Sequence, residues 1–151
     1  MSEALPGRCQ CGAVRYELRG APLTCYACHC LGCQRSAGSA YTISLLVHGA
    51  DLRVVEGELR ESAFAMPSGE RTWHGCARCG SSLWYTSPVA PEFAALKPGT
   101  LDEPARFEPV AHLWTQHKQP HVQLSDGAQA FDQQPATWAS LMQLWTQRQA
   151  D

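Results

Sequence analysis

Cysteine is the residue type in this chain whose number and spacing could do chemistry. The 151 residues include 8 cysteines, most of them in short clusters. The clusters are Cys9-x-Cys11, Cys28-x-Cys30-x-x-Cys33 and Cys76-x-x-Cys79, and the remaining cysteine is Cys25. A Cys-x-Cys pair is poorly suited to a disulfide because it would close a very small ring, whereas two thiolates at this spacing can bind one soft ion. The clusters therefore predict metal binding rather than a disulfide scaffold.

The two outer pairs predict a closed zinc site. Cys9 and Cys11 together with Cys76 and Cys79 supply four thiolates, which is the ligand set of a tetrahedral structural zinc. A glycine follows each pair, which lets the backbone turn tightly and bring its N–H groups to thiolate sulfur. We expect this site to contribute folding free energy and to have no open coordination position.

The central cluster predicts a different kind of site. Cys28, Cys30 and Cys33 can wrap three sulfurs around one ion from a single loop and helix start. Three protein ligands leave one coordination position open, which distinguishes a catalytic zinc from a structural one. Two alternatives stay open from the spacing alone. Cys25 could close the site as a fourth sulfur, or His29 could turn inward.

Length and composition narrow the class of protein. The chain has 12 Lys+Arg against 14 Asp+Glu, a formal charge of -2 and 44% hydrophobic residues. These values predict a single globular domain over residues 1–151 and argue against a disordered chain. Apolar runs are too short for a membrane span. Near-neutral charge without a Lys/Arg run argues against a nucleic-acid partner, and residues 1–8 carry no secretory signal, so we expect a cytoplasmic protein.

The elements that must position these cysteines are mostly strands. Alternation of apolar and polar residues predicts strands at 14–19, 41–47, 52–55, 59–64, 71–74, 82–85 and 110–114. Glu56-Gly57 predicts a tight turn, and residues 88–109 predict Pro-rich loops. A short helix is expected at 31–37, before Gly38.

A second helix is expected at about 135–149, beginning at Pro135. It carries an apolar stripe of Trp138, Leu141, Met142 and Trp145. We expect this stripe to dock on the strand core, with a homodimer contact as the alternative.

Three segments together resemble one known family. They are Gly7-Arg8-Cys9-Gln10-Cys11-Gly12-Ala13-Val14, Cys28-His29-Cys30-x-x-Cys33 with residues 35–39 behind it, and Cys76-x-x-Cys79-Gly80-Ser81. In these the chain is similar to the GFA family of glutathione-dependent formaldehyde-activating enzyme and centromere protein V. The similarity covers about residues 5–135, and the C-terminal helix departs from it.

The resemblance implies a mainly β, Mss4-like fold of antiparallel sheets stapled by two zinc ions per chain. It implies a structural zinc on Cys9, Cys11, Cys76 and Cys79. A second zinc would lie on Cys28, Cys30 and Cys33, with its fourth position open to water or to a substrate thiol. Cys25 is then the spare thiol.

The family reaction joins glutathione to formaldehyde as S-hydroxymethylglutathione. The resemblance therefore implies a carbon-sulfur lyase-type enzyme whose partner is a small thiol such as glutathione. Arg35, Arg71 and Lys97 are candidates for binding glutathione carboxylates, with solvated surface charge as the alternative for each. His29 is a candidate proton shuttle. His112 and Trp114 are candidate pocket residues, and Trp73 and His74 are expected to pack.

Two other functions compete with the enzyme. One is a non-catalytic zinc module that binds another protein. The other is a redox or metal-sensing protein, which would need an exposed Cys25 with a lowered pKa. Seven zinc-bound thiolates would move the net charge from -2 to nearer ~-5, which makes a nucleic-acid partner still less favourable.

Overall fold

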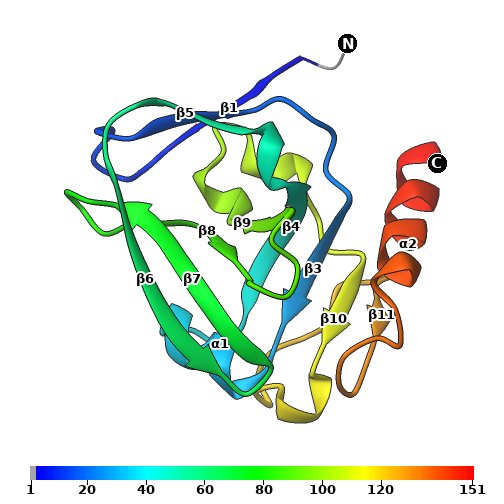
Figure 1. Cartoon of the computed structure of the whole chain (residues 1–151). Helices are drawn as coiled ribbons and strands as arrows, with labels where there is room; N and C mark the ends of the chain where they lie inside the picture. Colours follow the sequence, from blue (N-terminus) through cyan, green and yellow to red (C-terminus); the bar gives the residue numbers. More distant parts are fainter. Residues whose placement is uncertain (1–2) are drawn as a thin grey trace. The chain divides into compact units, whose positions relative to one another are not determined.

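A computed structural model of the chain describes residues 3–151. It divides into two compact units, which are described separately. The first comprises Met1–Pro22 with Leu46–Arg106, and the second comprises Leu23–Leu45 with Phe107–Asp151. Within the described residues there are eleven strands and two α-helices (Figure 1), so the prediction of a mainly β fold is confirmed.

The first unit contains two antiparallel strand arrays. The order β1-β2-β5 joins β1 (Leu5–Arg8), β2 (Arg15–Leu18) and β5 (Leu52–Glu56). The other array has the order β9-β8-β7-β6. Its members are β9 (Phe93–Leu96), β8 (Ser82–Thr86), β7 (Gly69–Cys76) and β6 (Leu59–Met66). Fully buried side chains, among them Val14, Leu18, Leu83 and Leu96, form the core of this unit.

The second unit is built on β3 (Thr24–Cys28) and β10 (Ala111–Leu113). β10 runs parallel to β3 on one side and to β11 (Gln129–Ala130) on the other. These pairs differ from the expected all-antiparallel sheets. They are possible because long stretches of chain separate the paired strands, as parallel strands require. β4 (Thr42–His48) crosses the boundary between the units after Leu45.

The two helices belong to the second unit. α1 (Leu31–Ala37) has the predicted bounds and ends at Gly38, which is left-handed with φ 60. α2 (Trp138–Ala150) begins three residues after Pro135, with Thr137 as its N-cap. The start was therefore predicted too early, because Pro135 is buried in the segment that leads into the helix.

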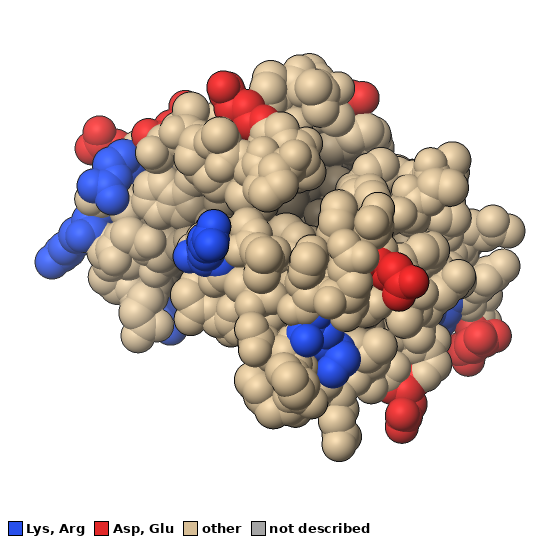
Figure 2. Space-filling view, turned by 90° about the horizontal axis from the view of Figure 1, so that it is seen from below, with Lys and Arg blue, Asp and Glu red and all other residues tan. Residues whose placement is uncertain are grey.

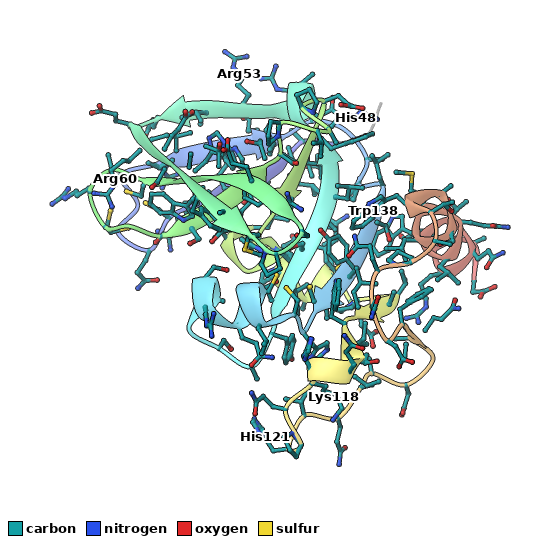
Figure 3. The ribbon with its side chains drawn as sticks, turned by 60° about the horizontal axis from the view of Figure 1, so that its bottom comes forward. His48, Arg53, Arg60, Lys118, His121 and Trp138 are labelled. Carbon is teal, nitrogen blue, oxygen red and sulfur yellow. The ribbon has the colours of Figure 1, made fainter. Side chains whose placement is uncertain are left out.

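The apolar stripe of α2 docks on β3, as predicted. Leu141 is fully buried, and its carbonyl accepts a hydrogen bond from Thr24 Oγ1 at 3.0 Å. Trp138 points from the start of the helix to the Tyr26 ring, with the ring centroids 5.1 Å apart (Figure 3). No helix among residues 3–151 is both long and apolar enough to cross a membrane.

Four strands were not predicted. β1 contains Pro6 and Gly7, which are poor strand formers but are tolerated at a sheet edge. β3 is buried along its whole length, so its sequence lacks alternation. β9 lies inside the region predicted as Pro-rich loops, and β11 has only two residues.

The tight turn predicted at Glu56-Gly57 is not formed: Gly57 lies in a bend, with φ 86. The strands on either side of this bend do not pair with each other. β5 pairs with β2, whereas β6 pairs with β7.

Candidate metal centres

The first unit brings the two outer cysteine pairs together. The Sγ atoms of Cys9, Cys11, Cys76 and Cys79 all lie within 4.8 Å of one another. Zinc–sulfur bonds of about 2.3 Å at tetrahedral angles place neighbouring sulfurs about 3.8 Å apart. The Cys9–Cys11 and Cys11–Cys76 sulfur distances of 3.6 and 3.9 Å bracket this value. Four thiols at these distances fit a tetrahedral zinc ion.

Two tight turns form this cluster. Gly12 and Gly80 adopt φ values of 78 and 76, so each glycine supplies the left-handed turn expected after its cysteine pair. Backbone N–H groups donate to the sulfurs, from Val14 to Cys9 at 3.2 Å and from Arg78 and Cys79 to Cys76 at 3.3 Å. These amides stabilise thiolate, which is the form that binds a metal.

Ser81 also contacts this cysteine cluster. It is part of the sequence motif, but the motif did not predict this contact. Its hydroxyl lies 3.1 Å from Cys79 Sγ and accepts a hydrogen bond from the Gln10 N–H at 3.0 Å. Ser81 therefore joins the two halves of the cluster. Its hydroxyl and nearby backbone amides lower the pKa of the exposed Cys79 thiol to about 5.

The second unit brings three thiols together at the junction of β3 and α1. The Sγ atoms of Cys28, Cys30 and Cys33 lie within 4.8 Å of one another. Cys28 ends β3, and Cys30 is the N-cap of α1, where its sulfur accepts a hydrogen bond from the Cys33 N–H at 3.3 Å. Hydrogen bonding among the three thiols lowers the pKa of Cys30 and raises that of Cys28. Three close sulfurs of which one is readily ionised fit a soft metal ion.

The two candidates for closing this site are not part of the sulfur group. Cys25 is fully buried in β3 outside the three-thiol cluster. Burial, and to a smaller extent the Glu108 carboxylate, raises the pKa of Cys25 to about 12. The redox-sensing function needed an exposed Cys25 with a lowered pKa, and the structure has neither property.

His29 is engaged elsewhere. It is fully buried, and its Nε2 lies 2.9 Å from His112 Nδ1. The Ser125 N–H donates to His112 Nε2 at 3.2 Å, so in the neutral His112 the proton lies on Nδ1 and is donated to His29. The proton of neutral His29 is therefore on Nδ1, a buried atom without a partner within the described residues. Burial first, and then the charges of His112 and Lys118, lowers the pKa of His29 to about 4.

Gln34 fixes α1 to the rest of the second unit, a role that no sequence motif indicated. Its amide nitrogen donates to the carbonyls of His29 and His117 at 2.8 and 3.0 Å. Its oxygen accepts from Gln119 Nε2 at 2.8 Å. The segment after β10 therefore holds the helix that carries Cys33. Lys118 and His121 lie on this segment (Figure 3).

The predicted cationic residues have different surroundings. Arg35 is exposed in the last turn of α1, two residues after Cys33. Arg71 and Lys97 belong to the first unit. Arg71 donates to the hydroxyls of Ser68 and Ser87, and Lys97 lies over the Tyr85 ring, 4.8 Å from its centroid. On the face shown in Figure 2, charged residues of both signs are scattered among uncharged ones.

The aromatic candidates are held by polar contacts. Trp114 adopts φ 58, and its Nε1 donates to Gln134 at 3.0 Å. Trp73 Nε1 donates to the Ser82 hydroxyl at 2.7 Å, and His74 lies 2.9 Å from the Thr86 hydroxyl and 3.2 Å from Glu61. Trp73 and His74 thus pack within their sheet, as predicted.

The fold and the two thiol clusters define a mainly β protein whose cysteines could hold two metal ions. A family model described as "Glutathione-dependent formaldehyde-activating enzyme" (GFA) matches residues 4–117, and the chain belongs to this family. A curated protein of Halomonas elongata, with the provisional name of glutathione-dependent formaldehyde-activating enzyme, is 32% identical over 136 residues. That alignment covers 83% of each chain.

The fold also has a counterpart among solved structures. A crystal structure of a Rhodobacter sphaeroides protein superposes with a TM-score of 0.51 and 20% identity. The match covers 84% of this chain and 99% of that one. The predicted family is therefore confirmed, and a solved structure shares the fold.

Proposed function

We propose that this protein is a zinc-dependent carbon–sulfur lyase-type enzyme acting on a glutathione-like thiol. The reaction we propose is the addition of the thiol to formaldehyde, giving S-hydroxymethylglutathione. The observation that carries the proposal is the group of three close sulfurs, Cys28, Cys30 and Cys33, which excludes Cys25. Family membership and the name of the Halomonas elongata relative support the choice of glutathione and formaldehyde.

In this proposal the two cysteine clusters have different tasks. Cys9, Cys11, Cys76 and Cys79 hold a structural zinc that stabilises the first unit. Cys28, Cys30 and Cys33 hold a catalytic zinc with one position left for the substrate. When bound there, zinc supplies a positive charge that keeps the substrate sulfur ionised near neutral pH. The lowered pKa of Cys30 and the N–H that Cys33 donates to its sulfur favour the thiolate form of this ligand.

The reaction forms one S–C bond and transfers one proton. The thiolate sulfur attacks the formaldehyde carbon, the C=O π electrons move to oxygen, and the oxygen takes up a proton, so nothing is oxidised or reduced. We assign this proton to solvent water, because His29 Nε2 is held by His112 and its Nδ1 is buried, so the neutral ring is not placed to donate. Arg35 is the proposed partner of a glutathione carboxylate.

The experiment compares adduct formation in the zinc-loaded wild type with two cysteine variants. Glutathione and formaldehyde are mixed with each protein, and the spontaneous rate is subtracted. Cys28→Ser should abolish the enzymatic rate, whereas Cys25→Ala, which changes a buried thiol outside the group, should keep it. If glutathione adds to formaldehyde no faster than the background with wild-type protein, the proposal is wrong, and the non-catalytic zinc module becomes the better account.

A further inference from the structure

A polar cavity in the first unit belongs to neither candidate metal centre. Its volume is about 710 Å³, and its walls come from β1, β2 and the chain around Thr100. Cys9 and Ser81 line one end, so the cavity borders the four-cysteine cluster. Cavities of this size hold small molecules in many proteins.

Two arginines lie at one end of the cavity. Arg8 and Arg15 both line it, and they are direct partners across the antiparallel pair of β1 and β2. Like charges directly opposite each other destabilise a sheet. Arg15 has only a long, exposed contact with Glu56 at 3.8 Å, and Arg8 has no carboxylate partner within residues 3–151. Within the described residues, Glu56 is the one carboxylate in ion-pair contact with these arginines, so a bound anion would further relieve their repulsion.

The opposite end of the cavity is acidic. Glu17 lines it and pairs with Pro6, two positions along the strands from the arginine pair. Arg19 contacts only Oε2 of Glu17, at 3.0 and 3.1 Å, which leaves Oε1 available. Asp102, another lining residue, is held at the same end because its N–H donates to the Pro6 carbonyl at 2.9 Å.

The wall between the two ends is preformed. Gly7 lies so close to Tyr16 that an added Cβ would come within 2.4 Å of the ring. The Tyr16 hydroxyl donates to Thr100 Oγ1 at 2.6 Å, since Thr100 itself donates to the Lys97 carbonyl. Gly7 also forms a β-bridge with Leu101 (Figure 1, where the yellow-green turns lie beside β1). These contacts therefore hold the backbone that carries the charged residues in a fixed position.

We propose that this cavity binds a short zwitterionic peptide. Its carboxylate would bind between Arg8 and Arg15, and its ammonium group would contact Glu17 and Asp102. Two strand positions at about 3.3 Å each separate the ends by about 7 Å, which is the extended length of about two residues. The assignment goes beyond the proposed function and does not depend on it.

The first test is calorimetric titration of the zinc-loaded full chain with glycylglycine, which has both charges and no thiol. We expect saturable binding at one site per chain. Blocking either terminus, as in N-acetylglycylglycine or glycylglycinamide, should weaken binding at least about tenfold. Failure to bind at millimolar concentration, or equal binding of the blocked peptides, would overturn the proposal.

Variants then locate the site. Arg8→Gln should weaken binding at least about tenfold while leaving the melting temperature unchanged or raised, because it removes one of two repelling charges. Asp102→Asn, at the acidic end, should independently weaken glycylglycine binding. Arg60→Gln is the matched control, since Arg60 lies over Trp73, does not line the cavity and points outward (Figure 3). If Arg8→Gln and Asp102→Asn bind glycylglycine as tightly as Arg60→Gln, the cavity is not the binding site.

Discussion

His29 and His112 form a buried hydrogen bond of 2.9 Å between Nε2 and Nδ1, and the Ser125 N–H fixes its direction. The two rings also stack, with centroids 5.2 Å apart. His29 lies between Cys28 and Cys30 in the sequence, so this bond ties the cysteine loop to β10. His29 lies outside the group of three candidate sulfur ligands, and the bond to His112 can be tested by substitution and by pH.

Substitution of His112 should destabilise the second unit. His112→Phe keeps a ring but leaves buried His29 Nε2 without a donor, which costs on the order of 1–3 kcal/mol. His112→Asn keeps an N–H donor and should cost less. Urea unfolding of the zinc-loaded proteins measures the difference. Equal free energies of unfolding for the two variants would show that the hydrogen bond does not stabilise the fold.

The free energy of unfolding should decrease as the pH drops below the ordinary pKa of histidine. The pKa of His29 is lowered to about 4, and burial also lowers that of His112. The folded state therefore favours the neutral rings, so their contribution is present above about pH 6.5 and is lost as the pH falls toward 4.

Thermal unfolding between pH 7 and 4 measures this loss. Zinc content must be followed in parallel, because acid also protonates thiolates. His29→Gln should flatten the part of the pH dependence that is not accompanied by zinc release, and a variant with an unchanged profile would contradict the assignment.

The four-cysteine cluster should control folding of the first unit. Cys76→Ser removes a buried ligand and should prevent stable folding, because a structural zinc site contributes several kcal/mol. Ser81→Ala removes only the hydroxyl beside Cys79 and should retain zinc with lower affinity. Measurement of zinc content after graded chelation distinguishes the Cys76→Ser variant from the Ser81→Ala variant. If Cys76→Ser stays folded with an unchanged melting temperature, the site is not structural.

Gly57 offers a test of the backbone beside this cluster. It has φ 86, and an added Cβ would lie 2.2 Å from the Ala13 carbonyl oxygen. Gly57→Ala should therefore cost more than the roughly 1–2 kcal/mol of the left-handed conformation alone. Gly99→Ala is the control, since open space surrounds that position and its φ is ordinary. Equal melting temperatures for both variants would contradict the close approach.

The features that could be predicted from the sequence are those that depend on local residue patterns. Cysteine spacing indicated both thiol clusters, Gly38 marked the end of α1, and alternation identified β2 and β4 to within a residue or two. What it missed depends on tertiary context. Buried β3 has no alternation, and two of the three partners of the Gln34 side chain lie 83 and 85 residues away in the chain. Likewise, the opposition of Arg8 and Arg15 follows from strand register rather than from any motif.

The central claim is that Cys28, Cys30 and Cys33 hold a zinc ion with one position open to a substrate thiol. Zinc-edge X-ray absorption with and without glutathione tests it most directly, and Cys25→Ala serves as the control. Without thiol, the seven cysteines of the two clusters give an average of about 3.5 sulfurs per zinc, and saturating glutathione should raise this to about 4 in both proteins. A value of 4 without thiol that falls in Cys25→Ala, or no change on adding glutathione, would contradict the claim.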